Sequence, residues 1–218
     1  PYSPDDQSLL MILGDQAGTA IYVAQLVAER QRVSQELALA WRIQQSFLPP
    51  TLPEIDGWAL TAVLHPARET CGDFYDVIGL PNGRYGLLIA DVADKGMAAA
   101  LYMALSRTLV RTYAIQHPDR PDLALRAANE RILQDSHSDQ FVTLFYAILD
   151  PEAGMLTYSN AGHNPPYLLS TDGQLRELGN TGIPLGIFPD NCWEQVSVRI
   201  APGTALLLYT DGVTEAQN

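Results

Sequence analysis

The sequence is short of positive charge and of cysteine, and each shortage excludes a class of function. Its 218 residues include 13 Lys and Arg against 25 Asp and Glu, a net charge of −12, and Lys95 is the single lysine. A chain with no basic run has little to neutralise phosphates, so we expect no nucleic-acid partner. Two cysteines, Cys71 and Cys192, make no disulfide framework, which indicates a reduced, cytoplasmic protein.

Long apolar runs and leader-like segments are also missing. No uninterrupted apolar run approaches the 18 or more residues of a membrane helix, and no charged-then-apolar leader opens the chain. An acidic surface also repels anionic lipid. The sequence therefore predicts no membrane association.

Several catalytic motifs do not occur. There is no G-x-x-x-x-G-K-[ST] phosphate loop, no HExxH zinc motif among the four histidines and no G-x-S-x-G nucleophile elbow. Neither cysteine has an arginine at the spacing of a thiol phosphatase loop, and Val198 stands where Cys192 would need one. Catalysis through a nucleophilic Cys or Ser is unsupported.

The first element that the sequence predicts is a long helix over residues 5–48. Apolar side chains from Leu9 to Val27 recur with the spacing of one helix face, and the double proline 49–50 ends the pattern. A continuous helix would be about 66 Å long, too long to bury its stripe against one small domain. We expect it to pair with a copy of itself or to join two domains. Polar Gln31, Ser34 and Gln44 near the seam make the heptad imperfect.

The remainder has the pattern of an α+β domain. Helices are expected over 97–113, where Met97, Leu101, Leu105 and Leu109 suggest a core stripe, and over 122–133. A turn at 81–83 predicts a hairpin. Strands are expected at 58–65, 74–80, 85–90, 141–149, 155–159, 167–169, 193–200 and 205–209. Two helices between two sets of antiparallel strands indicate α+β rather than alternating βαβ units.

Aspartates at strand ends are the candidates for chemistry. Asp73 and Asp76 stand where a strand begins, and Asp91 and Asp211 each close an apolar strand. A charge at the end of a buried strand is costly unless something pairs with it, and oxygen-rich sites suit Mg²⁺ or Mn²⁺. The alternative is that Asp91 and Asp211 merely cap turns, since Asp is a common turn residue.

Seven motifs in order resemble the metal-dependent protein serine/threonine phosphatases (the PPM, or PP2C-like, family) in their bacterial SpoIIE-like branch. They are 44–49 (QQSFLP), 71–76 (CGDFYD), 91–96 (DVADKG) with 98–101 (AAAL), 141–146 (FVTLFY), 160–166 (NAGHNPP), 182–186 (GIPLG) and 207–216 (LLYTDGVTEA). Their order is far more specific than any one motif, and together they cover residues from about 44 to 218.

The resemblance implies a fold and a site. The fold is a four-layer α-β-β-α sandwich of two antiparallel sheets flanked by helices, over residues 49–218, with residues 1–48 as the preceding helix. Asp73, Asp91 and Asp211 match the catalytic, metal-ligating aspartates, and Val92 offers its carbonyl. Two Mn²⁺ or Mg²⁺ ions would hold a bridging water that attacks phosphorus.

The match has departures. Cys71 replaces a usual glycine, and a fourth aspartate of the family pattern is not reached before Asn218. We therefore expect the C-terminal part of the domain to be missing and this chain to bind metal poorly. Residues 1–30 resemble, less specifically, the closing helix of a GAF-type sensor domain.

Three further residues have simpler interpretations beside functional ones. His163 is expected to satisfy a tight turn rather than act as a general acid, and Thr143 to use its hydroxyl locally. Lys95 is expected to be solvated rather than to steer a phosphate.

The leading function is a phosphatase acting on phosphoserine or phosphothreonine of a small regulatory protein, such as an anti-sigma-factor antagonist, as a homodimer through the N-terminal helix. One alternative is a catalytically silent partner-binding module of the same fold. A nucleotidyl cyclase would need base-recognition residues and a βαββαβ order, neither of which is found.

Overall fold

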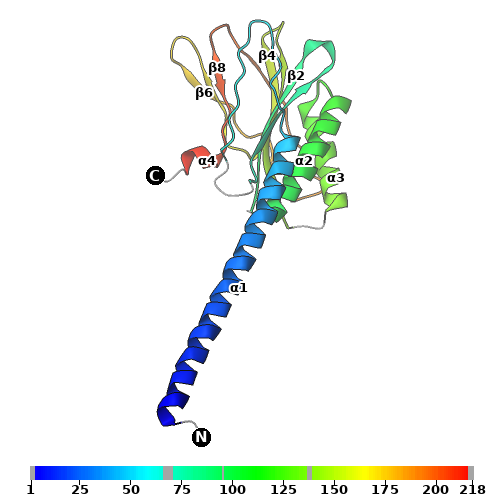
Figure 1. Cartoon of the computed structure of the whole chain (residues 1–218). Coiled ribbons are helices and arrows are strands. Elements are labelled where there is room, and N and C mark those ends of the chain that lie inside the picture. Colours follow the sequence, from blue (N-terminus) through cyan, green and yellow to red (C-terminus); the bar gives the residue numbers. More distant parts are fainter. Residues whose placement is uncertain (1–2, 66–70, 95, 137–138, 216–218) are drawn as a thin grey trace.

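The computed structural model describes residues 3–65, 71–94, 96–136 and 139–215. A single long helix, α1 (Pro4–Phe47), leads into a domain built of two antiparallel sheets and two further long helices (Figure 1). This confirms the predicted α+β class with two antiparallel sheets flanked by helices behind a long N-terminal helix. The observed end of α1 at Phe47 lies one residue before the expected boundary.

The larger sheet has five strands in the order β1-β2-β3-β4-β7. The strands are β1 (Phe74–Gly79), β2 (Tyr85–Val92), β3 (Val142–Asp150), β4 (Met155–Ala161) and β7 (Val196–Arg199). The hairpin predicted between β1 and β2 is present, with the short helix η1 (Pro81–Gly83) at its turn and Asn82 at a φ of 61°. Asn accepts this left-handed conformation more readily than most residues.

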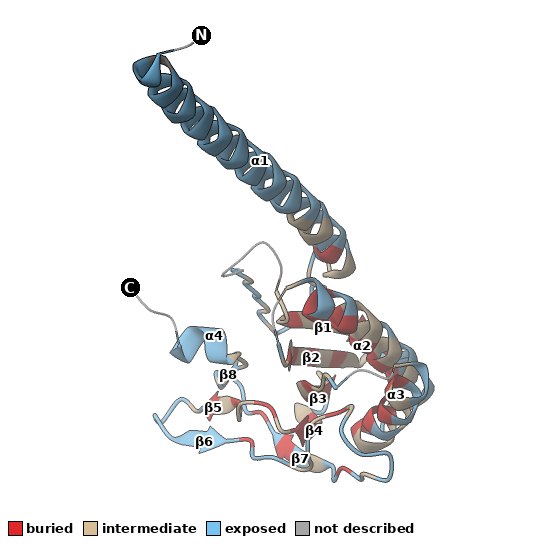
Figure 2. Cartoon of the chain, turned by 90° about the horizontal axis from the view of Figure 1, so that it is seen from below, coloured by how far each residue is buried: buried red, intermediate tan, exposed pale blue. Residues whose placement is uncertain are grey.

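The smaller sheet has the order β6-β5-β8, from β6 (Leu175–Glu177), β5 (Tyr167–Leu169) and β8 (Ala205–Leu207). Helices α2 (Met97–Gln116) and α3 (Pro121–Asp135) cover the face of the larger sheet that points away from the smaller one (Figure 2). The short helix α4 (Asp211–Thr214) lies beside the smaller sheet.

Strand alternation divides the core into two parts. On β2, Leu88 and Ala90 pack toward the helices, whereas Leu87 and Ile89 pack toward the other sheet. Successive side chains of a strand point to opposite faces, so Asp91, two positions after Ile89, faces the space between the sheets. Phe74 and Ile78 on β1 pack toward the helices, which places Asp76 on that side.

The leucine stripe predicted as the core face of α2 is wrong at its first two positions, whereas Leu109 is partly buried and packs against the core. Leu101 is 66% exposed and Met97 is also exposed, whereas the helix buries Ala99, Met103, Ser106, Val110 and Ala114. Residues spaced by four advance about 400° around a helix, so a strict four-residue stripe drifts about 40° per step off any one face. The buried set advances by steps of four, three, four and four, and the step of three turns it back toward the sheet.

The strand expected at 58–65 is also wrong. Trp58 forms an isolated bridge with Ile55, and the residues that follow to His65 are not in a strand. The other expected strands and helices are present within a few residues, while β6 and α4 were not expected.

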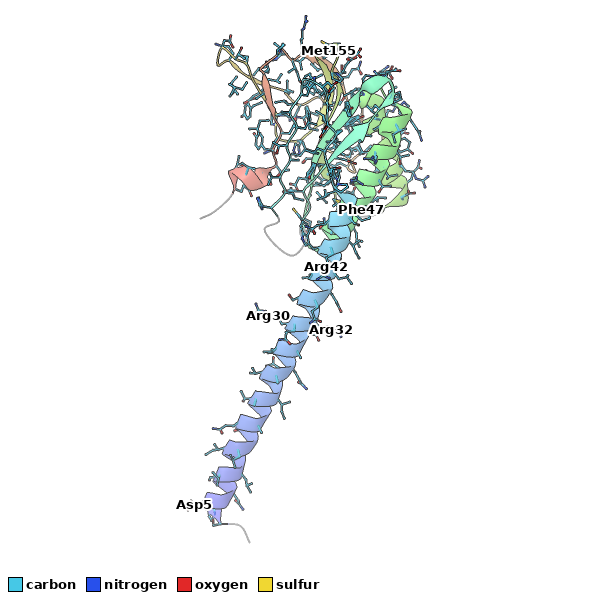
Figure 3. The ribbon with its side chains drawn as sticks, turned by 45° about the horizontal axis from the view of Figure 1, so that its top comes forward. Asp5, Arg30, Arg32, Arg42, Phe47 and Met155 are labelled. Atoms are coloured by element: carbon cyan, nitrogen blue, oxygen red, sulfur yellow. The ribbon has the colours of Figure 1, made fainter. Side chains whose placement is uncertain are left out.

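Helix α1 projects from the domain, and only its last turns contact it (Figures 1 and 2). Side chains such as Arg30, Arg32 and Arg42 point outward along it (Figure 3). Its large apolar side chains are exposed: Leu9, Leu10, Met11, Ile12, Leu13, Ile21, Tyr22, Val23, Leu26, Val27, Val33, Leu39 and Ile43.

The expectation that nothing in the chain could cross a membrane needs correction at α1. Between Gln7 and Phe47 the helix is long and apolar enough, by length and composition, to span one. Asp15, uncharged polar residues and glycines interrupt the apolar run between residues 7 and 28, and this is why a search for an unbroken run passed over it. Core helices of soluble proteins and signal sequences have the same composition, so this property alone does not place α1 in a membrane.

Candidate metal centre

Three aspartates from distant parts of the chain meet between the sheets. Asp73 directly precedes β1, Asp91 is the next-to-last residue of β2, and Asp211 begins α4. One carboxylate oxygen from each lies within 4.8 Å of the others. The structure therefore brings together the three aspartates singled out in the sequence, while their role as metal ligands stays a prediction.

The cluster is electrostatically unfavourable on its own. Burial raises the pKa of Asp91 to about 8, and a hydrogen bond with Asp73 and repulsion from Asp73, Asp211 and Glu215 act in the same direction. A carboxyl surrounded by like charges keeps its proton unless a cation offsets them. The surroundings of Asp91 thus favour a positively charged ligand.

Gly72 packs closely against Asp91 and Val92, at the edge of the aspartate cluster. A Cβ atom at this position would lie 2.8 Å from the Val92 carbonyl oxygen and 3.2 Å from Asp91 Oδ1. The Val92 amide donates a 3.4 Å hydrogen bond to the Gly72 carbonyl oxygen. Only glycine allows this approach, because both the Val92 carbonyl oxygen and Asp91 Oδ1 face the position that a Cβ would take. Oxygen donors of both kinds suit Mg²⁺ or Mn²⁺.

Thr210 was missed from the sequence. Its hydroxyl donates a 3.0 Å hydrogen bond to Asp73 Oδ2, so the residue before Asp211 holds the side chain of Asp73. A Thr-Asp pair after an apolar strand is a faint signal of such a bond, because the partner lies 137 residues away in the sequence.

The imidazole ring of His163 links β3 to Tyr209, the residue before Thr210. Its Nδ1 lies 3.0 Å from the Thr143 hydroxyl, and its Nε2 lies 3.2 Å from the Tyr209 carbonyl oxygen. Burial lowers the pKa of His163 to about 4, so the ring is neutral near pH 7. A single tautomer, with the proton on Nε2, donates to Tyr209 and accepts from Thr143, which leaves neither ring nitrogen for general acid chemistry.

Thr143 is the cross-strand partner of Asp91. Its hydroxyl also lies 3.4 Å from the Asp91 carbonyl oxygen. The turn that contains His163 is held by Asn160, whose side chain accepts from the His163 amide at 2.8 Å and donates to the His163 carbonyl at 3.1 Å. The Asn160 side chain thus satisfies this turn, whereas the His163 ring bridges β3 to the segment before Asp211. The Thr143 hydroxyl, expected to act locally, instead contacts a residue 20 positions away.

Other residues named from the sequence lie outside the cluster. Asp76 faces α2 and pairs with Arg107 and Arg111. Burial, together with the nearby Asp73 charge, raises the pKa of the Cys71 thiol to about 11, which keeps it protonated and unreactive. Lys95 lies outside the described residues.

A cavity of about 410 Å³ opens beside Asp73. Its walls include Leu64, Ile89 and the rings of Tyr167 and Tyr209, which stack with their centroids 5.9 Å apart. A mostly apolar hollow next to clustered acids is the form in which small-molecule and side-chain sites usually occur.

Two antiparallel sheets flanked by helices, with acids gathered between the sheets, define a PP2C-like domain. The chain belongs to the Stage II sporulation protein E (SpoIIE) family, whose model matches residues 81–218.

Two curated relatives match most of the chain. Protein IcfG of Synechocystis sp. is 35% identical over 210 residues, covering 84% of this chain and 33% of that protein. Phosphoserine phosphatase RsbU of Bacillus subtilis is 30% identical over 193 residues, covering 86% of this chain and 56% of that protein. The chain therefore spans between a third and just over half of the length of these relatives.

Solved structures show the same fold. The RsbU and RsbW domains of a Mycobacterium tuberculosis protein align with a TM-score of 0.60 and 31% identity, over 69% of this chain and 42% of that one. The SiaA-PP2C domain of Pseudomonas aeruginosa aligns with a TM-score of 0.70 and 22% identity, over 85% of this chain and 73% of that one.

Proposed function

We propose that the chain carries the catalytic domain of a metal-dependent protein serine/threonine phosphatase, a phosphoric monoester hydrolase acting on a small phosphorylated regulatory protein. One observation carries the proposal: in a SpoIIE-family chain, carboxylate oxygens of Asp73, Asp91 and Asp211 lie within 4.8 Å of one another. The names of two relatives, phosphoserine phosphatases RsbU and RsbP, support the same reaction.

The residues at the centre fit two Mn²⁺ or Mg²⁺ ions. Asp73, Asp91, Asp211 and the Val92 carbonyl offer only oxygen donors. Burial, and then the neighbouring acids, raise the pKa of Asp91, and a cation would offset the charge of those acids. Bound cations would supply Lewis acidity, which activates water as the nucleophile and offsets the charge that develops on the phosphoryl oxygens.

The chain's own residues would hold and orient these groups. The Thr210 hydroxyl fixes one oxygen of Asp73, and neutral His163 ties the segment before Asp211 to β3. The protonated Cys71 thiol is no nucleophile. A reaction that needs no covalent phosphoenzyme agrees with this set of residues.

Hydrolysis of p-nitrophenyl phosphate and of a phosphoserine peptide, titrated with Mn²⁺, tests the proposal. Because this chain is expected to bind metal weakly, the assay is run up to millimolar Mn²⁺. There we expect activity that EDTA abolishes and that Asp91→Asn lowers by at least about 100-fold, some 2.7 kcal/mol of barrier, because an amide lacks the charge to share between two cations. Asp172→Asn, in the exposed turn between β5 and β6, is the matched control. Metal-independent activity, or an Asp91→Asn variant within about tenfold of the parent, would contradict the proposal. A folded chain that binds a protein partner but shows no turnover would favour the silent module.

The N-terminal helix supports a second part of the proposal. We propose that residues 1–48 form a linker ahead of a phosphatase domain at 49–218, and that the protein is a cytoplasmic homodimer through α1. The exposed apolar side chains of α1 support this arrangement.

A further inference from the structure

The motif at 182–186 lies outside the aspartate cluster, and it begins a segment whose backbone is held by hydrogen bonds. The Ile183 carbonyl oxygen accepts a 2.9 Å hydrogen bond from Trp193 Nε1. Leu185 exchanges two 3.0 Å hydrogen bonds with Val142, one from each backbone amide. The first half of this segment is therefore fixed against the beginning of β3.

Asn129 holds the second half of the segment. This residue is buried in α3; its Oδ1 accepts from the Gly186 amide at 2.8 Å, and its Nδ2 donates to the Phe188 carbonyl oxygen at 2.9 Å. Gly186 has a φ of 89°, and a Cβ there would lie 3.1 Å from the Gln140 carbonyl oxygen. Glycine accepts this conformation and this close approach without strain. Residues 183–188, which we call the 183–188 loop, are thus held at both ends and in the middle.

Two large apolar side chains of the 183–188 loop are nevertheless exposed. Phe188 is 61% exposed and Ile187 is 39% exposed. Side chains that stay in water contribute little hydrophobic free energy to folding. On a backbone that is already fixed, they lose little further conformational freedom when a partner covers them, which favours binding. The 183–188 loop therefore has the properties of a preformed contact for another molecule.

The 183–188 loop lies at the end of the sheet that carries the aspartate cluster. Val142, which pairs with Leu185, is also the cross-strand partner of Val92, whose carbonyl is proposed as a metal ligand. Neighbouring strands lie about 4.8 Å apart, so Leu185 is roughly 10 Å from Val92 across the ladder. Phe188 follows three residues later, which adds roughly 10 Å at most. An extended peptide, at about 3.3 Å per residue, would span this distance with three to six residues.

Charge and position favour a protein substrate as the molecule that covers this loop. The chain has a net charge of −12, which repels anionic lipid and acidic segments. Residues 183–188 themselves carry no charge, so they suit an uncharged apolar group. A second copy of the chain has the longer apolar surface of α1 to pair with. A polypeptide whose phosphoserine lies at the aspartates can reach Phe188 within a few residues.

We propose that Ile187 and Phe188 form a docking site for an apolar side chain of the phosphoprotein substrate, three to six residues from the phosphoserine. The proposal rests on the proposed function and adds a feature of the substrate to it. Asn129 acts as a positioning residue, because its amide holds the backbone on either side of Ile187.

Hydrolysis of matched phosphoserine peptides by the 218-residue chain, in millimolar Mn²⁺, tests the proposal. Each peptide has a Gly-Ser background and one pair of leucines, placed three, four, five or six residues on either side of the phosphoserine. The reference peptide has serines at all these positions. We expect KM for the best leucine peptide to lie about 10-fold below KM for the reference, an effect within the reach of one well-placed apolar anchor. The value of kcat should change little, because contacts away from the reacting atoms stabilise ground state and transition state alike.

Phe188→Ser and Ile187→Ser remove the docking side chains. Leu175→Ser is the matched control, because Leu175 on β6 is as exposed as Phe188. We expect the ratio of KM for the reference to KM for the best leucine peptide to fall from about 10 to about 1 in Phe188→Ser, and to stay near the parent value in Phe188→Leu and in Leu175→Ser. The ratio compares two substrates of one variant, so a general loss of activity cancels from it.

Equal KM values for all peptides in the parent, or a KM ratio that Phe188→Ser leaves unchanged, would overturn the inference alone. An equal loss in Leu175→Ser would do the same. A lower mass of Phe188→Ser than of the parent by light scattering, with the KM ratio unchanged, would assign the loop to a contact between copies instead. A folded parent chain that does not hydrolyse p-nitrophenyl phosphate would overturn the proposed function and this inference with it.

Discussion

Asp76 and Asp91 lie on paired strands, yet they experience opposite electrostatic surroundings. Asp76 shares the β1 face of Phe74 and Ile78 and meets the arginines of α2. Asp91 lies on the opposite face of the sheet, beside other acids, where its pKa is raised to about 8. The two-residue period of a strand therefore decides which acid is neutralised within the fold and which is left for a ligand.

The raised pKa of Asp91 predicts how metal-free stability depends on pH. A carboxyl that titrates near 3.8 when unfolded and near 8 when folded keeps its proton only in the folded state between those values. The folded state then binds more protons, so stability falls as pH rises from about 4 to 8. Asp91→Asn removes this titration, and we expect the variant in EDTA to gain stability over the parent as pH rises through that window.

Thermal unfolding of both proteins in EDTA, at several pH values from 4.5 to 8.5, measures the difference. Other titrating groups, including His163, are common to both proteins and largely cancel. Parallel profiles would contradict the assigned surroundings of Asp91. Added Mn²⁺ should stabilise the parent more than the variant, because a ligand that binds only the folded state raises its stability.

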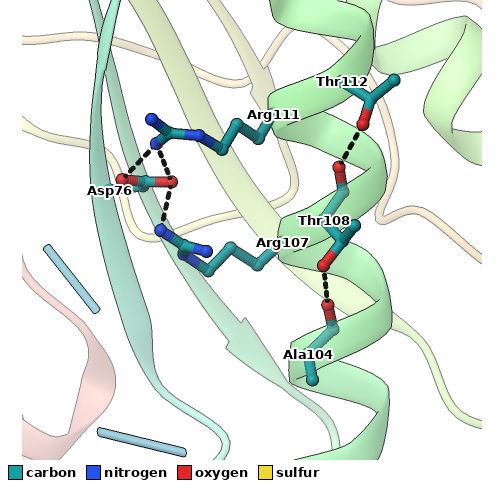
Figure 4. Close-up of polar contacts among 6 residues, drawn as sticks. All are labelled: Asp76, Ala104, Arg107, Thr108, Arg111 and Thr112. Atoms are coloured by element: carbon teal, nitrogen blue, oxygen red, sulfur yellow. Dashed lines mark hydrogen bonds and ion pairs between the residues drawn. The ribbon is translucent and has the colours of Figure 1, made fainter. Parts of the chain in front are cut away.

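Among the elements, α2 and β1 are joined by the ion cluster of Asp76, Arg107 and Arg111 (Figure 4). Arg107 Nη2 lies 2.9 Å from Asp76 Oδ2, and Arg111 Nη1 lies 2.9 and 2.8 Å from the two carboxylate oxygens. Asp76 is fully buried, Arg107 is 12% exposed and Arg111 is 41% exposed. The cluster therefore fixes α2 against β1 in a largely dry environment.

Asp76→Asn should be strongly destabilising. Removing the carboxylate leaves the Arg107 charge buried without its partner, a change that costs roughly 3–5 kcal/mol in comparable buried pairs. Glu130→Gln breaks the exposed pair with Arg126 on α3 and should cost less than about 1 kcal/mol. Urea unfolding of the metal-free variants measures both, and a loss below about 1 kcal/mol for Asp76→Asn would show that the cluster contributes little.

Sequence patterns predicted most elements because their signals are local. The turn at 81–83 and the apolar run of β2 depend on neighbours in the chain, and both were predicted. The partners of Asn129, Thr210 and His163 lie 20 to 137 residues away, and no local pattern encodes such pairings. The prediction of the core face of α2 failed for a related reason, since the side that meets the sheet carries Ala99 and Ser106 as well as Met103, and a leucine pattern does not reveal it.

At the scale of the whole molecule, a single copy of the chain leaves the apolar side chains of α1 exposed to water. Its 44 residues correspond to about 66 Å of helix. Leu9, Ile12, Leu13, Ile21 and Val27 lie on one predicted stripe and are exposed. Ten such side chains in a dimer would contribute at most roughly 15–30 kcal/mol if fully buried, against roughly 4–15 kcal/mol for association. Burial of the stripe in a dimer is therefore large enough to offset the cost of association over most of these ranges.

We therefore predict a parallel dimer that depends on the stripe. Ile12→Glu with Ile21→Glu places charges in the seam and should give a monomer by light scattering at micromolar concentration. Gln7→Glu with Gln25→Glu adds the same charge about 160° around the helix from Leu9 and Val27 and should leave the dimer intact. A parent chain that is monomeric at high micromolar concentration while α1 stays helical would contradict the prediction. Flotation of the parent with phosphatidylcholine vesicles, abolished by the stripe variant alone, would assign the same side chains to a bilayer instead, because burial in lipid satisfies an apolar helix as well as a second copy does.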